Sequence, residues 1–447
     1  MNGHELCVRR GPRRTCRTCH RARPVRAISI PLAVAAIAFI ASMAATSARA
    51  QVPASIEAQL QKMGHIVDPG CTAVLYRPLM PKKDIVDQLA EMQAENKPSS
   101  EVPIYPGITI YRDVSFGPNP KDVVDVFTAD KGQKSRPVLL YVPGGVGNKI
   151  ELQNRAANAF YDNIGRWATQ HGMVAVIMQR HGQAPGAKPD YYAGAKDVAA
   201  AIEFLQQNIG TYRGDPNRIF AWAQSAGNGP LGIYAGHPDL YTPKGIGLVG
   251  IIFMSGQFDI LRPDGTDPLP AAAAGGFGGG ANLFGAAGKT CGLKGGAFST
   301  EGVLPGHSPD QPGGQAPFAM PRGGLRFGGP PVSKQVQIEE SSLPGLEKTD
   351  AKILLASAEL DPGANGGPTP FNQALHDELC KLDGPDAASG HGPHAVSGRG
   401  HCPALLYEKG ESHISEVYSI DTSDHIVSGP ILAWIQRVDA TLRSRHE

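Results

Sequence analysis

Residues 213–227 read RGDPNRIFAWAQSAG, and they indicate the fold more clearly than any other part of the sequence. Its apolar run, IFAW at 219–222, is typical of a short buried strand. Ser225 follows, with Ala223 and Gly227 two positions to either side. Small residues at these two positions are typical of a tight turn that leads from a strand into a helix, because larger side chains would clash in such a turn. We therefore predict that Ser225 lies on a strand-to-helix turn.

Apolar runs and helical patterns alternate on both sides of this stretch. Runs typical of strands lie at residues 123–127, 138–142, 174–178, 248–254 and 352–356, and patterns typical of helices lie at 154–171, 195–209, 371–382 and 426–443. Short continuous apolar runs between helices indicate parallel strands that are buried on both faces. We therefore predict an α/β fold, in which a mostly parallel central sheet carries helices on both faces.

The first 50 residues differ from the rest of the chain. Eight arginines lie within residues 1–26, an apolar run follows at 27–45, and Ala48 and Ala50 form a small-residue pattern ahead of Gln51. A basic start, an apolar run and an A-x-A pattern are typical of a secretory signal peptide. We expect export to the periplasm or the medium. The alternative is an N-terminal membrane anchor, since about 18 apolar residues can span a bilayer.

Two regions are expected after this signal. Residues 51–107 show amphipathic helical patterns and are predicted to form a cap-like segment, and residues 108–447 are predicted to form the α/β domain. An insertion at about 262–338 interrupts that domain, and 19 of the 55 glycines lie between Gly265 and Pro330. A stretch with so much glycine and so few β-branched residues is expected to be flexible or disordered.

The net charge of the whole chain, +1, hides an imbalance. Nine of the 42 basic residues and one of the 41 acidic residues lie in residues 1–50, so the rest has 33 basic and 40 acidic residues and a net charge of −7. Binding to nucleic acid relies on basic side chains that neutralise phosphates. We therefore expect no nucleic-acid partner, and no stable membrane span once the signal is removed.

Four cysteines lie beyond the signal, and an even number in an exported protein suggests disulfides. Cys380 and Cys402 flank one loop and are the expected pair, which leaves Cys71 and Cys291 as the second pair by elimination. Buried reduced thiols are the alternative. His391, His394, His401 and Cys402 could also be read as metal ligands, but they have no fixed spacing, and we expect neither metal nor cofactor.

A set of motifs around Ser225 resembles the α/β-hydrolase superfamily, in particular its carboxylesterase and hormone-sensitive-lipase-like branch. The motifs are DVAAAI at 197–202, NI at 208–209, GDPNRI at 214–219 and QSAG at 224–227. That branch has D-x-x-x-A, N-I, G-G-D-P-x-R-I and G-x-S-A-G in the same order; here Arg213 and Ala223 each replace a glycine. The resemblance covers roughly residues 113–259 and 341–434. It implies an α/β-hydrolase fold with Ser225 as the nucleophile.

A glycine-rich loop follows the predicted strand at 138–142. Serine hydrolysis needs backbone N–H groups that face the developing oxyanion, and glycine lets the backbone come close. The resembled branch has H-G-G-G at this point, whereas this chain has Pro143 in place of the histidine and Val146 in place of the last glycine. The resemblance places the oxyanion hole at Gly144, Gly145 and Val146, together with the N–H of Ala226.

The acid and the base are expected after later strands. Residues 357–362 (SAELDP) and the following helix match the resembled pattern, which puts the acid at Asp361, with Glu359 as the alternative. Residues 411–415 (ESHIS) provide His413 as the base, and His425 is its competitor. The order serine, acid, histidine is that of α/β-hydrolases.

These residues predict a serine hydrolase that cleaves carboxylic esters of small or lipid-like molecules through an acyl-enzyme. Two alternatives stay open: a serine peptidase or amidase on the same fold, and an inactive α/β-hydrolase-like binding protein.

Overall fold

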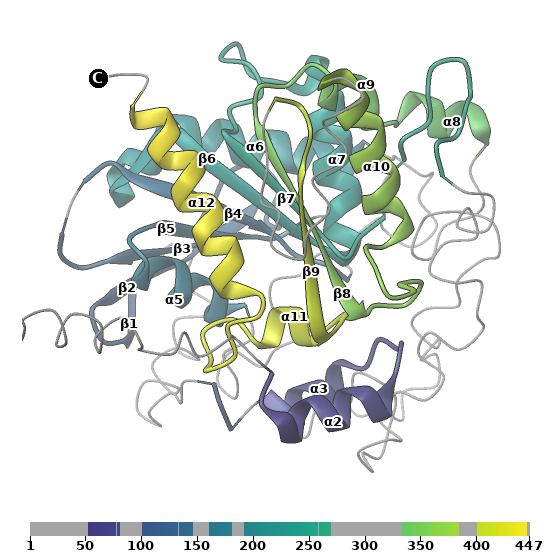
Figure 1. The fold of residues 1–447 in the computed structure, drawn as a ribbon. Coiled ribbons are helices and arrows are strands. Elements are labelled where there is room, and N and C mark those ends of the chain that lie inside the picture. Colours follow the sequence, from purple (N-terminus) through teal and green to yellow (C-terminus); the bar gives the residue numbers. More distant parts are fainter. Residues whose placement is uncertain are drawn as a thin grey trace, which may run out of the picture. The chain divides into compact units, whose positions relative to one another are not determined.

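A nine-stranded sheet runs through the part of the chain that the computed structural model describes (Figure 1). The described residues are 52–76, 78–80, 101–132, 134–145, 161–180, 192–257, 259–269, 333–383 and 400–444. By its internal contacts the chain divides after Arg49, and all of these residues belong to the unit Ala50–Glu447. The predicted signal and most of the predicted insertion therefore lie outside the described residues.

The sheet is mostly parallel, as predicted. Its strands are β1 (Glu101–Tyr105), β2 (Ile108–Ser115), β3 (Val123–Ala129), β4 (Arg136–Val142), β5 (Val174–Met178), β6 (Gly214–Gln224), β7 (Gly250–Met254), β8 (Lys352–Leu360) and β9 (Ala404–Ser412). Their order across the sheet is β1-β2-β3-β5-β4-β6-β7-β8-β9. The pairings from β1 to β3, and that of β3 with β5, are antiparallel, whereas every pairing from β5 to β9 is parallel.

The parallel register brings the carboxyl ends of the central strands to one edge. Val142 at the end of β4 pairs with Ala223 of β6, and Gln224 of β6 pairs with Met254 at the end of β7. In open α/β sheets, ligands bind outside the carboxyl ends of the strands. This edge is therefore where the predicted site residues should meet.

Helices cover both faces of the sheet, which confirms the predicted α/β class (Figure 1). The helices are α2 (Ala54–Met63), α3 (Pro69–Tyr76), α5 (Asp162–Gln170), α6 (Ala193–Asn208), α7 (Asn228–Gly236), α8 (Lys334–Glu339), α9 (Leu343–Leu346), α10 (Pro370–Cys380), α11 (Ser415–Tyr418) and α12 (Ser428–Arg443). One core holds residues of α5 and α12 together with α2, α3 and α11. The other core holds residues of α6, α7, α9 and α10.

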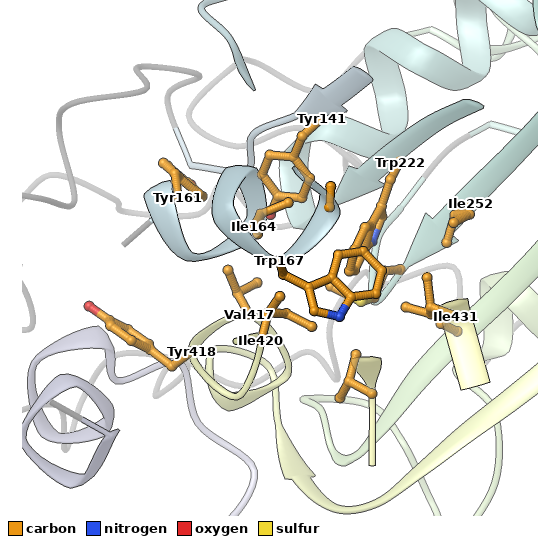
Figure 2. Packing of buried hydrophobic residues seen from close by; sticks show 14 of the residues in the cluster. Tyr141, Tyr161, Ile164, Trp167, Trp222, Ile252, Val417, Tyr418, Ile420 and Ile431 are labelled. Atoms are coloured by element: carbon orange, nitrogen blue, oxygen red, sulfur yellow. The ribbon is translucent and has the colours of Figure 1, made fainter. Parts of the chain in front are cut away.

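Aromatic side chains join α5 to the sheet, as Figure 2 shows. The ring of Trp167 packs edge-on against Trp222 of β6 at 6.0 Å, and Trp222 packs edge-on against Tyr141 of β4 at 5.7 Å. The helix comes close because Gly165 faces Phe127, where a Cβ would lie 2.7 Å from the ring. These contacts fix the strand, β4, that precedes the predicted oxyanion loop.

Several predicted boundaries differ from the structure. The predicted domain border at residue 107 cuts the hairpin of β1 and β2, so the sheet begins within the region that we expected to be a helical cap. The end of the predicted insertion is ordered, since α8 begins after Ser333, whose hydroxyl accepts from the Val336 N–H. Strands β2 and β9 were also not predicted.

The expected disulfide between Cys380 and Cys402 is confirmed. Cys71 is disulfide-bonded as well. Its predicted partner, Cys291, lies outside the described residues, so that pairing stays a prediction. Among the helices that the structure describes, none is both long and apolar enough to cross a bilayer.

Candidate active site

Ser225 lies on the predicted tight turn between β6 and α7. The strand ends at Gln224, Ser225 has a positive φ of 53°, and α7 begins at Asn228. Positive φ is uncommon outside glycine and is typical of functional turns. The turn also needs Gly227, where a Cβ would lie 2.3 Å from the carbonyl oxygen of Val142. The small residue predicted at this position is therefore enforced by the end of the neighbouring strand.

The structure brings Ser225, His413 and Asp361 together at this edge of the sheet. His413 Nε2 lies 2.7 Å from Ser225 Oγ, and His413 Nδ1 lies 3.2 Å from Asp361 Oδ1. Asp361 comes directly after β8 and His413 directly after β9, and all three side chains are buried. A carboxylate only accepts hydrogen bonds, so it favours the tautomer in which Nδ1–H donates and Nε2 accepts from the serine hydroxyl.

The two alternative residues point elsewhere. Glu359 Oε2 accepts a hydrogen bond from the backbone N–H of Gly410 at 2.7 Å. The ring of His425 faces Ser428 at the start of α12, at 3.5 Å. The geometry therefore joins Ser225 to Asp361 and His413 rather than to either competitor.

The surroundings of His413 favour its protonated form. Burial alone would lower its pKa, but the charge of Asp361 and the hydrogen bond to it, with a smaller effect from Glu416, raise the pKa above its ordinary value. A base whose pKa is raised in this way takes a proton from a serine hydroxyl more readily.

Glu416 is a site residue that the sequence did not reveal. Gln224, next to Ser225, donates through Nε2 to the His413 carbonyl at 2.8 Å and to Glu416 Oε1 at 2.8 Å. The hydroxyl of Ser255, directly after β7, donates to Glu416 Oε2 at 2.6 Å. Glu416 thus links the ends of β6 and β7 to the loop that carries the histidine. Only the fold brings these distant residues together.

Further buried acids surround this link. Burial raises the pKa of Glu416, Glu408 and Glu411 well above the ordinary carboxyl value, and the charges of neighbouring acids raise each of them further. Tyr76 of α3 donates to Glu411 at 3.3 Å and to Asp424 at 3.1 Å. Helix α3 therefore packs, through Tyr76, against the end of β9 that directly precedes His413.

The predicted oxyanion loop lies beside Ser225. A Cβ on Gly144 would lie 2.8 Å from the Ser225 Cβ, and Gly145 has a positive φ of 54°. Ala226 follows Ser225 within the short 3-10 turn Ser225–Gly227. Val146, the remaining predicted member, lies outside the described residues. The glycines at 144 and 145 are thus required by space at the first position and by conformation at the second.

One group of described residues could hold a metal ion by its ligand types, and it includes none of Ser225, Asp361 and His413. It consists of His376, Cys380 and Cys402. The two sulfurs are joined to each other in the disulfide. His391 and His394, which the sequence offered as possible metal ligands, lie outside the described residues.

Part of this chain is similar to known proteins. Residues 124–237 match the BD-FAE family. The chain is similar to a probable isoprenylcysteine α-carbonyl methylesterase of Oryza sativa subsp. japonica, with 28% identity over 121 residues, 26% of each chain. It is also similar to gut esterase 1 of Caenorhabditis briggsae, with 35% identity over 101 residues, 21% of this chain and 17% of that protein. A chlorogenic acid esterase of Aspergillus niger shares 32% identity over 116 residues, 24% of this chain and 21% of that protein. These matches span about a quarter or less of each relative.

Solved structures extend over more of the chain at low identity. A truncated carbohydrate esterase from gut microbiota aligns with a TM-score of 0.45 and 13% identity, over 74% of this chain and 96% of that chain. Esterase B from Lactobacillus rhamnosis aligns with a TM-score of 0.44 and 10% identity, over 88% of this chain and 98% of that chain.

The strand order, the serine turn and the family match agree with the resemblance that the sequence motifs indicated. The chain therefore has the α/β-hydrolase fold, and over residues 124–237 it matches BD-FAE, an esterase family of that superfamily.

Proposed function

We propose that this chain is an exported serine esterase that hydrolyses carboxylic esters of small molecules. The observation that carries the proposal is the hydrogen-bonded series from Ser225 through His413 to Asp361 at the carboxyl edge of the parallel sheet. The similarity to three esterases supports the same chemistry, and so does the BD-FAE match, whose range 124–237 contains Ser225.

The geometry accounts for each step of acyl transfer. His413 Nε2 takes the proton of Ser225 as its Oγ attacks the ester carbonyl, and Asp361 stabilises the imidazolium that forms. The negative charge that develops on the carbonyl oxygen is held by backbone N–H groups of the glycine loop and of Ala226. His413 then gives its proton to the leaving alcohol. Water, activated by the same histidine, releases the acid and restores the serine.

A pair of variants tests this proposal. Wild-type protein should hydrolyse short p-nitrophenyl esters, Ser225→Ala should remove the activity, and Ser444→Ala, an exposed serine near the end of α12, should retain it. Hydrolysis of peptides or amides in preference to esters would favour the peptidase alternative. A folded wild type that cleaves neither class of substrate would favour the binding protein.

Export is the second part of the proposal. The basic and apolar pattern of residues 1–50 supports it, and so does the Cys380–Cys402 disulfide, because such bonds persist mainly in oxidising compartments. Expression with the full leader in a bacterial host should yield a periplasmic or secreted protein whose N-terminus is Gln51. Recovery of an uncleaved, membrane-bound chain would contradict export by a cleaved signal and favour an anchor.

A further inference from the structure

Arg180 lies next to the oxyanion loop as a consequence of strand register. It comes two residues after the end of β5, which is the parallel neighbour of β4. Tyr141 of β4 pairs with Ile177 of β5, so the segments that follow the two strands run side by side. Arg180 as a whole residue is only 8% exposed, although it carries a guanidinium group. A charged group buried this far needs hydrogen-bond partners.

Three successive carbonyl groups of the loop accept hydrogen bonds from this one guanidinium. Arg180 Nε donates to the carbonyl of Pro143 at 3.0 Å, and Nη2 donates to those of Gly145 at 3.2 Å and Gly144 at 3.4 Å. In a trans peptide the C=O and N–H bonds point in opposite directions. Holding the Pro143 and Gly144 carbonyls toward the guanidinium therefore turns the N–H groups of Gly144 and Gly145 away from it.

We propose that Arg180 is a positioning residue for ester hydrolysis, which fixes the peptide groups after Pro143 and Gly144 so that the N–H groups of Gly144 and Gly145 are set for the oxyanion before substrate binds. This inference rests on the proposed esterase function. Arg180 does not itself touch the reacting atoms in this account; it acts through the carbonyl groups of the loop.

The loop needs such a partner because its own sequence does not fix it. Gly144 and Gly145 have the widest conformational freedom of any residue type, and Gly145 adopts a positive φ. Oxyanion stabilisation is effective when the donors are already in place and do not reorganise during the reaction. On its other side the loop is limited by Ser225, against which Gly144 lies. Arg180 and the nucleophile thus hold the loop from two directions.

The chemistry of arginine suits this task better than that of lysine. The guanidinium is planar and presents several N–H donors in a fixed arrangement, whereas a lysine ammonium is a compact charge on a flexible chain. One guanidinium can therefore serve three carbonyls of adjacent peptides at once. Arg180→Lys should keep the charge but lose the arrangement, and should restore only part of the function that Arg180→Met removes.

Arg136 provides a matched control at the opposite end of β4. It has the same exposed fraction, 8%, and its Nη2 also donates to a backbone carbonyl, that of Lys131. It begins the strand that the oxyanion loop follows, so it is far from that loop along β4. Arg136→Met should remove a buried guanidinium and its backbone hydrogen bond while leaving the loop in place.

The experiment compares Arg180→Met, Arg180→Lys and Arg136→Met with wild type. We expect Arg180→Met to lower kcat on a p-nitrophenyl ester by about 100-fold with little change in KM, the size of effect seen when an oxyanion-hole donor is lost. Affinity for a trifluoromethyl ketone, whose adduct with the serine carries an oxyanion, should fall in parallel. Added guanidinium ions should partly restore kcat, and Arg136→Met should retain it.

A second readout does not depend on activity. Hydrogen–deuterium exchange of a peptide that contains residues 143–145 should rise in Arg180→Met and stay unchanged in Arg136→Met. Folded Arg180→Met with wild-type kcat, or with unchanged exchange in the loop, would overturn the inference. So would an equal loss of kcat in Arg136→Met. If the wild type itself hydrolyses no ester, the proposed function fails, and the exchange measurement still decides whether Arg180 positions the loop.

Discussion

Replacing Gly227 with alanine should disable the site through the neighbouring strand. The added Cβ would lie 2.3 Å from the carbonyl oxygen of Val142 and 2.9 Å from that of Pro143. Non-bonded heavy atoms pack at about 3.5 Å, so the nearer pair overlaps by about 1 Å. Both contacts are backbone atoms, which cannot rotate away as a side chain would. The overlap must therefore displace either the turn that carries Ser225 or the start of the oxyanion loop.

A shift of this size has a predictable cost in rate and in stability. A misplacement of about 1 Å in an active site can lower the rate by about 100-fold. Forcing extra volume into a packed region costs about 1–3 kcal/mol of folding free energy. We expect Gly227→Ala to lower kcat/KM on a p-nitrophenyl ester by at least about 100-fold. We also expect it to lower the free energy of unfolding in urea by about 1–3 kcal/mol.

Gly229 is the matched control for Gly227. It lies two residues further on, within α7, and a Cβ there would have only an ordinary contact, 3.8 Å from the Gln257 carbonyl oxygen. Alanine is favoured over glycine inside a helix by about 0.5–1 kcal/mol, so Gly229→Ala should be slightly stabilising and active. If Gly227→Ala had wild-type kcat/KM and stability, or if both variants lost activity equally, the reasoning on the turn would be wrong.

Three further predictions follow from the same contacts. Asp361→Asn should lower kcat by about 10⁴-fold. Because this change removes the carboxylate that raises the pKa of His413, the acid limb of the residual kcat/KM profile should move to lower pH. An acid limb that does not move would contradict the assignment of Asp361. Burial raises the pKa of Glu408 in the folded chain, so the folded state retains a proton that the unfolded chain releases. Its contribution to stability is therefore present at low pH and lost as pH rises above the ordinary carboxyl pKa. Glu408→Gln should flatten this decline in urea unfolding measured at pH 5 and pH 8, and an unchanged slope would exclude Glu408 as a contributor. The Cys380–Cys402 disulfide closes a loop with a sequence separation of 22, so replacing both cysteines with alanine should lower the free energy of unfolding by about 3 kcal/mol. An unchanged free energy of unfolding in urea would show that the bond does not stabilise the fold.

The parallel strands from β4 to β8 could be predicted from sequence because their central residues are apolar on both faces of the sheet. Strand β2 was missed because it buries a charge: Arg112 is 1% exposed and pairs with Asp125 at 2.9 Å and Asp162 at 2.8 Å. Strand β9 was missed for a similar reason, since it buries Glu408 and Glu411. A hydrophobic pattern identifies a strand only when the inward positions are apolar.

The same limit applies to the site. Ser225, Asp361 and His413 each stand within a local motif that places them after a strand, so the sequence was enough to nominate them. Arg180 and Glu416 have no such motif. Their contacts depend on which strands are neighbours and in what register, and that information exists only in the folded chain.

The most direct test of the account is the covalent labelling of the nucleophile. Folded protein is treated with a fluorophosphonate probe, digested, and mapped by mass spectrometry, with Ser225→Ala and heat-denatured wild type as controls. The account predicts one phosphonate per chain, attached to Ser225 Oγ, and no label in either control. Folded wild-type protein that takes up no label, or takes it up at another serine, would contradict the assignment of Ser225 as a nucleophile activated by His413.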